Sequence, residues 1–247
     1  MTDYPQVAVA YLHPGEVSHA FSMSLLKLML HETARTGMPP FVFAQRCGTL
    51  GIVRGRNETT RDFLDRTTCE WLLWIDSDMG FAPDSLERLL RSADKYNRPI
   101  LGGLCFGLRR EETTPDTNAE RFRMFPTIYG WREFDDRVGF EVRVDYPRDQ
   151  VTAASATGAA FMLVHRRALD AIRQRDGDNW FTQVTHPVGP TEFSEDMSFC
   201  IRAAAANQAV HVHTGVKTCH DKGGIFLDEN AWDRQQTLDA PAAAPAA

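Results

Sequence analysis

Short apolar runs alternate with apolar stripes of helical spacing along the first hundred residues. The runs have the length of buried strands, and each stripe repeats its apolar residues every three or four positions, as one face of a helix does. The predicted strands are 7–12, 41–44, 71–75 and 99–104, and the predicted helices cover 21–29, 59–64 and 86–93. Strands that alternate with helices in this way form parallel sheets. We therefore predict an α/β fold with a mainly parallel central sheet flanked by helices.

The pattern changes in the second half of the chain. The segment 109–125 is charged and without periodicity, which predicts a mobile loop that covers the functional site. Two alternating segments then predict a smaller antiparallel part, and two strands and two helices follow it. These later segments are 126–131, 138–144, 156–165, 167–172, 195–206 and 209–213, after which 218–224 returns to a loop.

Composition and charge narrow the class of protein. The chain has 247 residues, 43% of them apolar, and can bury the core of one large domain, which we place at residues 1–238. The Ala- and Pro-rich segment 239–247 is predicted to be disordered. A formal net charge of -6 gives no electrostatic footprint for nonspecific binding of nucleic acid.

Cysteine usage and the amino terminus bear on the compartment. The five cysteines are widely spread and include no Cys-x-x-Cys pair, which predicts reduced thiols and argues against a zinc-cysteine site. The amino terminus lacks the basic and apolar regions of a signal peptide, and no apolar run reaches membrane-spanning length. We therefore expect a cytoplasmic protein without a membrane span.

The apolar run 71–75 ends at two carboxylates, Asp76 and Asp78, with Ser77 between them. Open parallel sheets bind their ligands at the carboxyl ends of the strands. Two residues apart in an extended segment, the carboxylates leave the same face and can share one divalent cation and the oxygens of a diphosphate. The segment 76–80 also has the composition of a turn, so a metal site and a simple turn are both open at this point.

Three further candidate groups stand at the ends of predicted elements. Glu195 and Asp196 begin a predicted helix, and His220 lies in the loop after the last predicted strand. The two acids suit catalysis, but carboxylates also stabilise a helix amino terminus. His220 is either a ligand or a solvated histidine. His211 and His213, two apart on a predicted strand, are an alternative pair of metal ligands.

A cluster of basic and amide residues lies further upstream. Arg54, Arg56 and Asn57 follow a loop that Gly48 and Gly51 open. Guanidinium groups match the geometry of phosphate oxygens, so this cluster can clamp the base or the diphosphate of a nucleotide. Its alternative is the solvated face of a helix.

Taken in chain order, these residues resemble the GT-A family of nucleotide-sugar glycosyltransferases, especially its family-2-like enzymes, over about residues 5–225. The matching segments are 75–78, Gly102-Gly103, 158–161, Glu195-Asp196 and His220. The motif spacing is also similar to that of small phage-encoded or actinobacterial glycosyltransferases. The resemblance implies a GT-A (Rossmann-like) fold, with a nucleotide-sugar-binding half at 1–104 and an acceptor and catalytic half at 105–238.

The resemblance also implies a role for each residue. The metal site comprises Asp76, Asp78 and His220: Asp78 and His220 bind Mn²⁺ or Mg²⁺, and Asp76 holds the ribose or a metal-bound water. Asp196 is the general base, and Glu195 positions the acceptor or the loop. The residues implied for the nucleotide-sugar donor are His13, Pro14, Glu16, Arg54, Arg56, Asn57, Asp76, Ser77, Gly102 and Gly103.

The implied activity is metal-dependent transfer of a sugar from a nucleoside-diphosphate sugar to an acceptor hydroxyl, with inversion. A nucleotidyltransferase acting on a sugar phosphate has the same needs for metal and phosphate, and a non-catalytic sugar-binding protein is a third reading. A haloacid-dehalogenase-type phosphatase fits less well because Met79-Gly80 replaces the usual following residues. The acceptor class stays open between protein, glycan, lipid head group and modified DNA, and a phage-encoded enzyme would work in the host cytoplasm.

Overall fold

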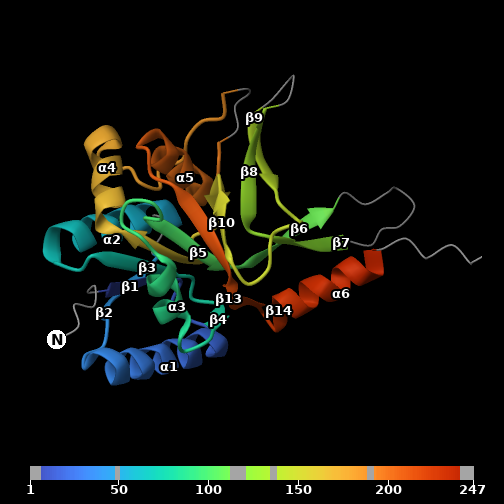
Figure 1. The fold of residues 1–247 in the computed structure, drawn as a ribbon, viewed down its shortest axis with the longest axis horizontal. Helices are drawn as coiled ribbons and strands as arrows, with labels where there is room; N and C mark the ends of the chain where they lie inside the picture. The colour runs from blue at the N-terminus through green and yellow to red at the C-terminus, as the bar shows by residue number, and fades with distance from the viewer. Residues whose placement is uncertain (1–6, 48–50, 112–120, 134–137, 188–191, 240–247) are drawn as a thin grey trace, which may run out of the picture.

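The centre of the computed structural model, which describes residues 7–47, 51–111, 121–133, 138–187 and 192–239, is a twisted sheet (Figure 1). Its main strands are β1 (Val7–His13), β2 (Phe41–Arg46), β3 (Trp71–Ile75), β5 (Ile100–Leu104), β10 (Val151–Ala154), β12 (Phe161–His165) and β13 (Val210–Lys222). They lie in the order β10-β13-β5-β12-β3-β1-β2. Five of the seven run in one direction, and only β12 and β10 oppose them. The predicted mainly parallel α/β fold is thereby confirmed.

Helices cover both faces of this sheet because its central strands are apolar on both sides. Alternate residues of β1 and β3 enter two different cores: Ala8 and Leu72 belong to one, and Val9 and Leu73 to the other. Three helices contribute to the first core, namely α2 (Gly51–Arg66), α4 (Arg166–Asp176) and α5 (Glu195–Ala205). The second core receives α1 (His19–Thr36) and α3 (Ser85–Ser92), which lie on the opposite side of the sheet in Figure 1.

A smaller antiparallel part lies beside the central sheet, as the sequence predicts. Its elements are β6 (Phe106–Glu111), β7 (Arg121–Pro126), β8 (Ile128–Glu133), β9 (Val138–Val142), β11 (Ala156–Thr157), β14 (Ile225–Leu227) and α6 (Glu229–Asp239). The strands form a β6–β7 hairpin and a β11-β8-β9 sheet, while β14 pairs with β13. A third core, which contains Phe106, Met124 and Trp232, joins these elements to β5 and β13.

The prediction of a loop at 109–125 is wrong for every described residue of that segment. Residues 109–111 and 121–125 belong to the β6–β7 hairpin, and 112–120 lie outside the described residues. The strands are polar because one side of the hairpin faces solvent: the cross-strand neighbours Arg109 and Arg123 lie on that side, while Phe106 and Met124 on the other side enter the third core. Arg123 and Glu111 form an ion pair across the two strands, with an N–O distance of 3.2 Å. Charged residues of this kind interrupt the apolar alternation by which a strand is predicted from sequence.

Two further boundaries differ from the sequence prediction. The helix α2 begins at Gly51, so the expected loop before residue 59 is the first half of a helix. The strand β13 continues through Lys222, so 218–222 is not a loop; it pairs with β14 and with β4 (Met79–Phe81) after a register shift between His213 and Lys217. The predicted disordered tail, apart from Asp239 at the end of α6, lies outside the described residues.

The states of the cysteines and the lengths of the helices can be read from the structure. All five cysteines are free. No helix among the described residues is both long and apolar enough to cross a membrane.

Arg166 fastens the carboxyl end of α2 to the rest of the fold. Its guanidinium donates to the carbonyl oxygens of Phe63, Leu64, Thr67 and Cys69 at 2.7–2.9 Å. The last carbonyls of a helix have no partner inside the helix, so these bonds satisfy groups that water would otherwise have to reach. The position of α2, which carries Arg56, therefore depends on this side chain.

We expect Arg166→Met to lower the free energy of unfolding by about 2–4 kcal/mol, because several bonds from a charged donor are lost and buried carbonyls are left unpaired. Denaturant-induced unfolding measures the change. Arg175→Met is the matched control, since Arg175 is half exposed and, among the described residues, its guanidinium pairs with the adjacent Asp176. Equal destabilisation by both substitutions would contradict the assignment.

Candidate active site

The turn after β3 is held by backbone hydrogen bonds from three other segments. The Asp76 amide donates to the Ala160 carbonyl at 2.9 Å, and the Ser18 amide donates to the Ser77 carbonyl at 2.9 Å. The Asp221 amide of β13 donates to the Asp78 carbonyl at 2.8 Å. The two aspartates thus leave the carboxyl end of a central strand on a fixed backbone.

Strand register places His220 beside Asp78. The short strand β4 pairs with β13 so that His220 lies opposite Met79, the residue after Asp78. His220 Nε2 lies 3.1 Å from Asp78 Oδ1, without the alignment that a hydrogen bond requires. On the other side of the carboxylate, Lys222 Nζ donates to Asp78 Oδ2 at 2.9 Å.

The charges around Asp78 keep it ionised. Burial by itself raises the pKa of Asp78, but the neighbouring His220 imidazole and Lys222 ammonium outweigh burial and lower the pKa to about 2. Asp78 is therefore a carboxylate throughout the neutral range and can accept a cation there.

The His220 ring has the tautomer of a metal ligand. Its Nδ1 lies 3.1 Å from the Phe106 carbonyl oxygen and donates to it, so in the neutral form of the ring, the form that binds metal, the lone pair is on Nε2. Nε2 is buried and has no hydrogen-bond partner among the described residues. A carboxylate oxygen beside an unpartnered imidazole nitrogen fits Mn²⁺ or Mg²⁺, the imidazole favouring Mn²⁺.

Two protein ligands do not complete a coordination shell. No group of three or more His, Cys, Asp or Glu side chains in the described part of the chain is arranged to hold a metal ion. Mg²⁺ sites of phosphate-handling enzymes commonly use one or two carboxylates, with phosphate oxygens and waters in the other positions. The pair formed by Asp78 and His220 fits a cation of that kind rather than an all-protein metal site.

Arg56 lies between the acidic turn after β3 and the two acids at the start of α5. Arg56 rises from α2 and is 2% exposed. One guanidinium nitrogen, Nη2, donates to Asp76 Oδ1 at 3.0 Å, and the other, Nη1, contacts Asp196 Oδ1 and lies 3.4 Å from Glu195 Oε1. The carboxylates of Asp76 and Asp196 therefore lie one guanidinium group apart, although 120 residues separate them in the chain.

The guanidinium is both buried and surrounded by acids. Burial lowers the pKa of Arg56, but the charges of Asp196, Asp76 and Glu195 outweigh burial, and the pKa is raised above its usual value. Glu195 and Asp196 stand at the start of α5, and Ser194 before them makes no side-chain capping bond. The two acids thus use their side chains on Arg56 rather than only on the helix end.

A cleft of about 480 Å³ opens beside the Asp76–Asp78 turn. The expected donor residues His13, Pro14, Glu16, Asp76 and Ser77 all line it, as does Asp78. The cleft is within the size range of small-ligand sites. It is therefore large enough for a nucleotide portion of a donor.

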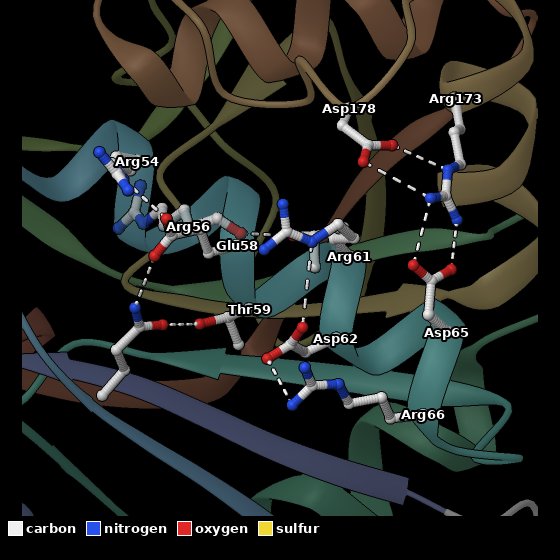
Figure 2. Close-up of polar contacts among 12 residues, drawn as sticks. Arg54, Arg56, Glu58, Thr59, Arg61, Asp62, Asp65, Arg66, Arg173 and Asp178 are labelled. Atoms are coloured by element: carbon white, nitrogen blue, oxygen red, sulfur yellow. Dashed lines mark hydrogen bonds and ion pairs between the residues drawn. The ribbon is translucent and has the colours of Figure 1, made fainter.

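Other expected donor residues lie away from this cleft. Arg54 is 57% exposed, and its Nε lies 2.6 Å from an oxygen of Glu58 on the next turn of α2. Figure 2 shows this pair. The Asn57 side chain accepts from the Phe181 amide at 2.8 Å and donates to the Thr182 hydroxyl at 3.0 Å. The structure thus gives both side chains protein partners, and Asn57 fixes the segment that packs under Arg56.

Gly102 and Gly103 are buried in β5, where protein atoms leave no room for a side chain. A Cβ on Gly102 would meet Thr157 Oγ1 at 2.9 Å, and one on Gly103 would meet the Phe161 ring at 3.0 Å. The two glycines therefore allow neighbouring protein segments to pack closely and do not make room for a ligand. His211 and His213 pair with Leu101 and Gly103 near the start of β13, far along the strand from His220.

Lys222 and the connecting role of Arg56 were not predicted from the sequence. The sequence did contain a signal for Lys222, because it lies two residues after His220 and directly before Gly223-Gly224. On a strand, residues two apart share a face, so Lys222 follows His220 to Asp78 once 218–222 is known to be a strand.

Comparison with known proteins supports the fold. No protein-family model and no curated protein matches the sequence. The crystal structure of A197 from STIV matches with a TM-score of 0.52 at 11% identity, over 91% of both chains. The crystal structure of GalNAc-T7 with UDP, GalNAc and Mn²⁺ matches with a TM-score of 0.54 at 10% identity, over 89% of this chain and 44% of that chain.

At these identities the likeness concerns the fold alone. The central sheet, its two helical layers and the antiparallel part together define a GT-A-like fold, which confirms the fold that the sequence resemblance implied. This chain spans under half of the GalNAc-T7 chain, so the activity of that protein is not carried over with the fold.

Proposed function

We propose that the protein is a metal-dependent glycosyltransferase that moves a sugar from a nucleoside-diphosphate sugar to an acceptor hydroxyl, with inversion. The observation that carries the proposal is the meeting of Asp76, at the end of β3, with Asp196, at the start of α5, around Arg56 beside the cleft. The GT-A-like fold adds support, because the similar GalNAc-T7 was crystallised with UDP, GalNAc and Mn²⁺.

In this proposal the cleft beside the Asp76–Asp78 turn holds the donor nucleotide, and residues 1–104 supply most of its contacts. Asp78 and His220 would hold a divalent cation at the diphosphate. When bound, the cation neutralises the charge that develops on the departing diphosphate. Residues 105–238 supply the base and the acceptor side.

The transfer forms one bond and breaks one. The acceptor oxygen attacks the anomeric carbon while the bond from that carbon to the diphosphate oxygen breaks, and the nucleoside diphosphate leaves with those electrons. The hydroxyl proton passes to the carboxylate of Asp196, the proposed general base. Its side chain is 23% exposed, so an acceptor can reach it without unfolding of α5.

A thermal-shift screen of nucleotide sugars tests the donor class. We expect one nucleoside-diphosphate sugar to raise the melting temperature in the presence of Mn²⁺ and much less with a chelator. A ligand present at a hundred times its Kd stabilises the folded state by about 2.7 kcal/mol. No stabilisation by any nucleotide sugar, with or without metal, would remove the proposal.

Product analysis with the stabilising donor then separates the rival activities. A glycosyltransferase releases a nucleoside diphosphate, to an added acceptor or slowly to water. A nucleotidyltransferase instead forms pyrophosphate from a nucleoside triphosphate, and a sugar-binding protein gives stabilisation without turnover. The last two outcomes would each replace the proposed reaction.

A further inference from the structure

Arg56 connects the two halves of the candidate active site without facing the cleft. It is absent from the cleft lining, and its guanidinium is enclosed by protein, with the Cζ atom 5.3 Å from the centroid of the Phe181 ring and 6.0 Å from that of Trp74. Both aromatic rings are fully buried in the core. The side chain therefore has no free surface on which a donor phosphate could lie.

The guanidinium is suited to holding two carboxylates at a fixed separation. Its nitrogens form a planar, rigid fork, and the two outer nitrogens of Arg56 point to different elements: Nη2 to Asp76 after β3, and Nη1 to Asp196 on α5. The Phe181 ring beneath the fork is held in turn by the bond from the Phe181 amide to Asn57 Oδ1. Arg56 is thus fixed on both its apolar and its polar side.

The charge balance shows what the fork prevents. Arg56 is the positive partner of three carboxylates, those of Asp76, Glu195 and Asp196. Without it, three like charges in a partly buried site would repel one another, and Asp196 would lose the contact that directs it toward Asp76. An ammonium group has the charge but not the two-sided fork, so lysine would keep neutralisation and lose the fixed spacing.

We propose that Arg56 is a positioning residue: it sets the carboxylate of Asp196 relative to the donor-side carboxylate of Asp76 and does not bind the donor itself. This inference rests on the proposed function, because it gives Asp196 the role of base. A displacement of a catalytic group by about 1 Å is enough to cost about a hundredfold in rate.

The test compares Arg56→Lys with Arg61→Met in turnover of the nucleotide sugar that gives the largest thermal shift. Arg61 is the control because it lies on the same helix, is 45% exposed and, among the described residues, forms its ion pair with the adjacent Asp62. We expect Arg56→Lys to lower kcat by about a hundredfold and to leave the donor KM and the Kd of the nucleoside diphosphate with Mn²⁺ within about threefold of the parent values. Arg61→Met should change neither. Melting curves establish that each variant is folded.

A double-mutant cycle separates positioning from a general structural role. In an Asp196→Asn background there is no ionised base to position, so Arg56→Lys should reduce the residual kcat by less than about threefold. In a Glu195→Gln background the full loss should return. If kcat of the double variant falls by the product of the two single-variant losses, Arg56 acts independently of the base, and the inference is overturned.

Other outcomes are equally decisive. An increase of about tenfold or more in the nucleoside diphosphate Kd with unchanged kcat would make Arg56 a donor ligand instead. If Arg56→Lys fails to fold, Arg56→Met, which keeps the unbranched apolar stem, replaces it in the same cycle. If the folded parent protein binds the nucleotide but turns over no donor, the proposed function is wrong, and this inference is wrong with it. If the parent protein is active and Arg56→Lys leaves kcat unchanged, the inference alone is wrong.

Discussion

Asp196→Asn is expected to lower the rate of sugar transfer by about a hundredfold to ten-thousandfold, the usual cost of losing a positioned base. The substitution keeps the size of the side chain and an oxygen that can still accept from Arg56 Nη1. The helix end loses only a charge-dipole interaction of about 0.3–1 kcal/mol, so the protein should stay folded. Single-turnover measurements with a saturating donor give the rate of the chemical step.

Donor affinity provides the internal control for this experiment. The affinity for the donor should survive Asp196→Asn, because the lining of the donor cleft includes Asp76 and Asp78 but not Asp196. Glu195→Gln should retain more activity, since Glu195 makes the longer contact with Arg56, at 3.4 Å. A folded Asp196→Asn protein that transfers sugar at the parent rate would return both acids to the ordinary role of charges at a helix start.

His220→Asn is expected to weaken the binding of Mn²⁺ and of the nucleoside diphosphate together, each by about a hundredfold or more in the presence of the other. Asparagine can keep a donor near the position of Nδ1, which bonds the Phe106 carbonyl, but it has no counterpart of Nε2 beside Asp78. The change therefore removes the metal-facing atom with little loss of packing. Titration calorimetry with Mn²⁺, nucleoside diphosphate and both together measures the effect.

His211→Asn is the matched control on the same strand. Burial and the nearby Arg98 lower the pKa of His211, which favours the neutral ring that a metal ligand needs, but His211 lies near the opposite end of β13. Its substitution should leave the affinity for Mn²⁺ and for the nucleotide unchanged. If His211→Asn abolishes metal binding and His220→Asn does not, the metal site has been assigned to the wrong histidine.

The central sheet and the acidic turn could be predicted because their cause is local. A run such as 71–75 without polar alternation is stable only when both faces are covered, and the abrupt change to Asp76 marks where the cover ends. The same reasoning misread 109–125, because a strand with one solvated face and charged cross-strand pairs has no apolar run.

The connections within the site could not be predicted because they depend on pairing between distant segments. The Nη1 of Arg56 reaches Asp196, 140 positions along the chain, and Asn57 reaches the Phe181 amide, 124 positions along. On sequence, Arg54 and Arg56 look equivalent. Burial distinguishes them: one is 57% exposed on the outer face of α2, and the other is 2% exposed.

The antiparallel strand β12 sets the order in which the protein can assemble during synthesis. Leu163 pairs with Leu73 on one side and with Leu101 on the other, so residues that leave the ribosome early wait for a strand made much later. Until then β3 has one bare apolar edge and β5 has two, because its other neighbour, β13, is made later still, and such edges are templates for pairing with other chains. A nascent chain that ends before residue 161 is thus the state of this protein most exposed to aggregation, and its donor-side strands gain their last neighbour only as the acceptor side is completed.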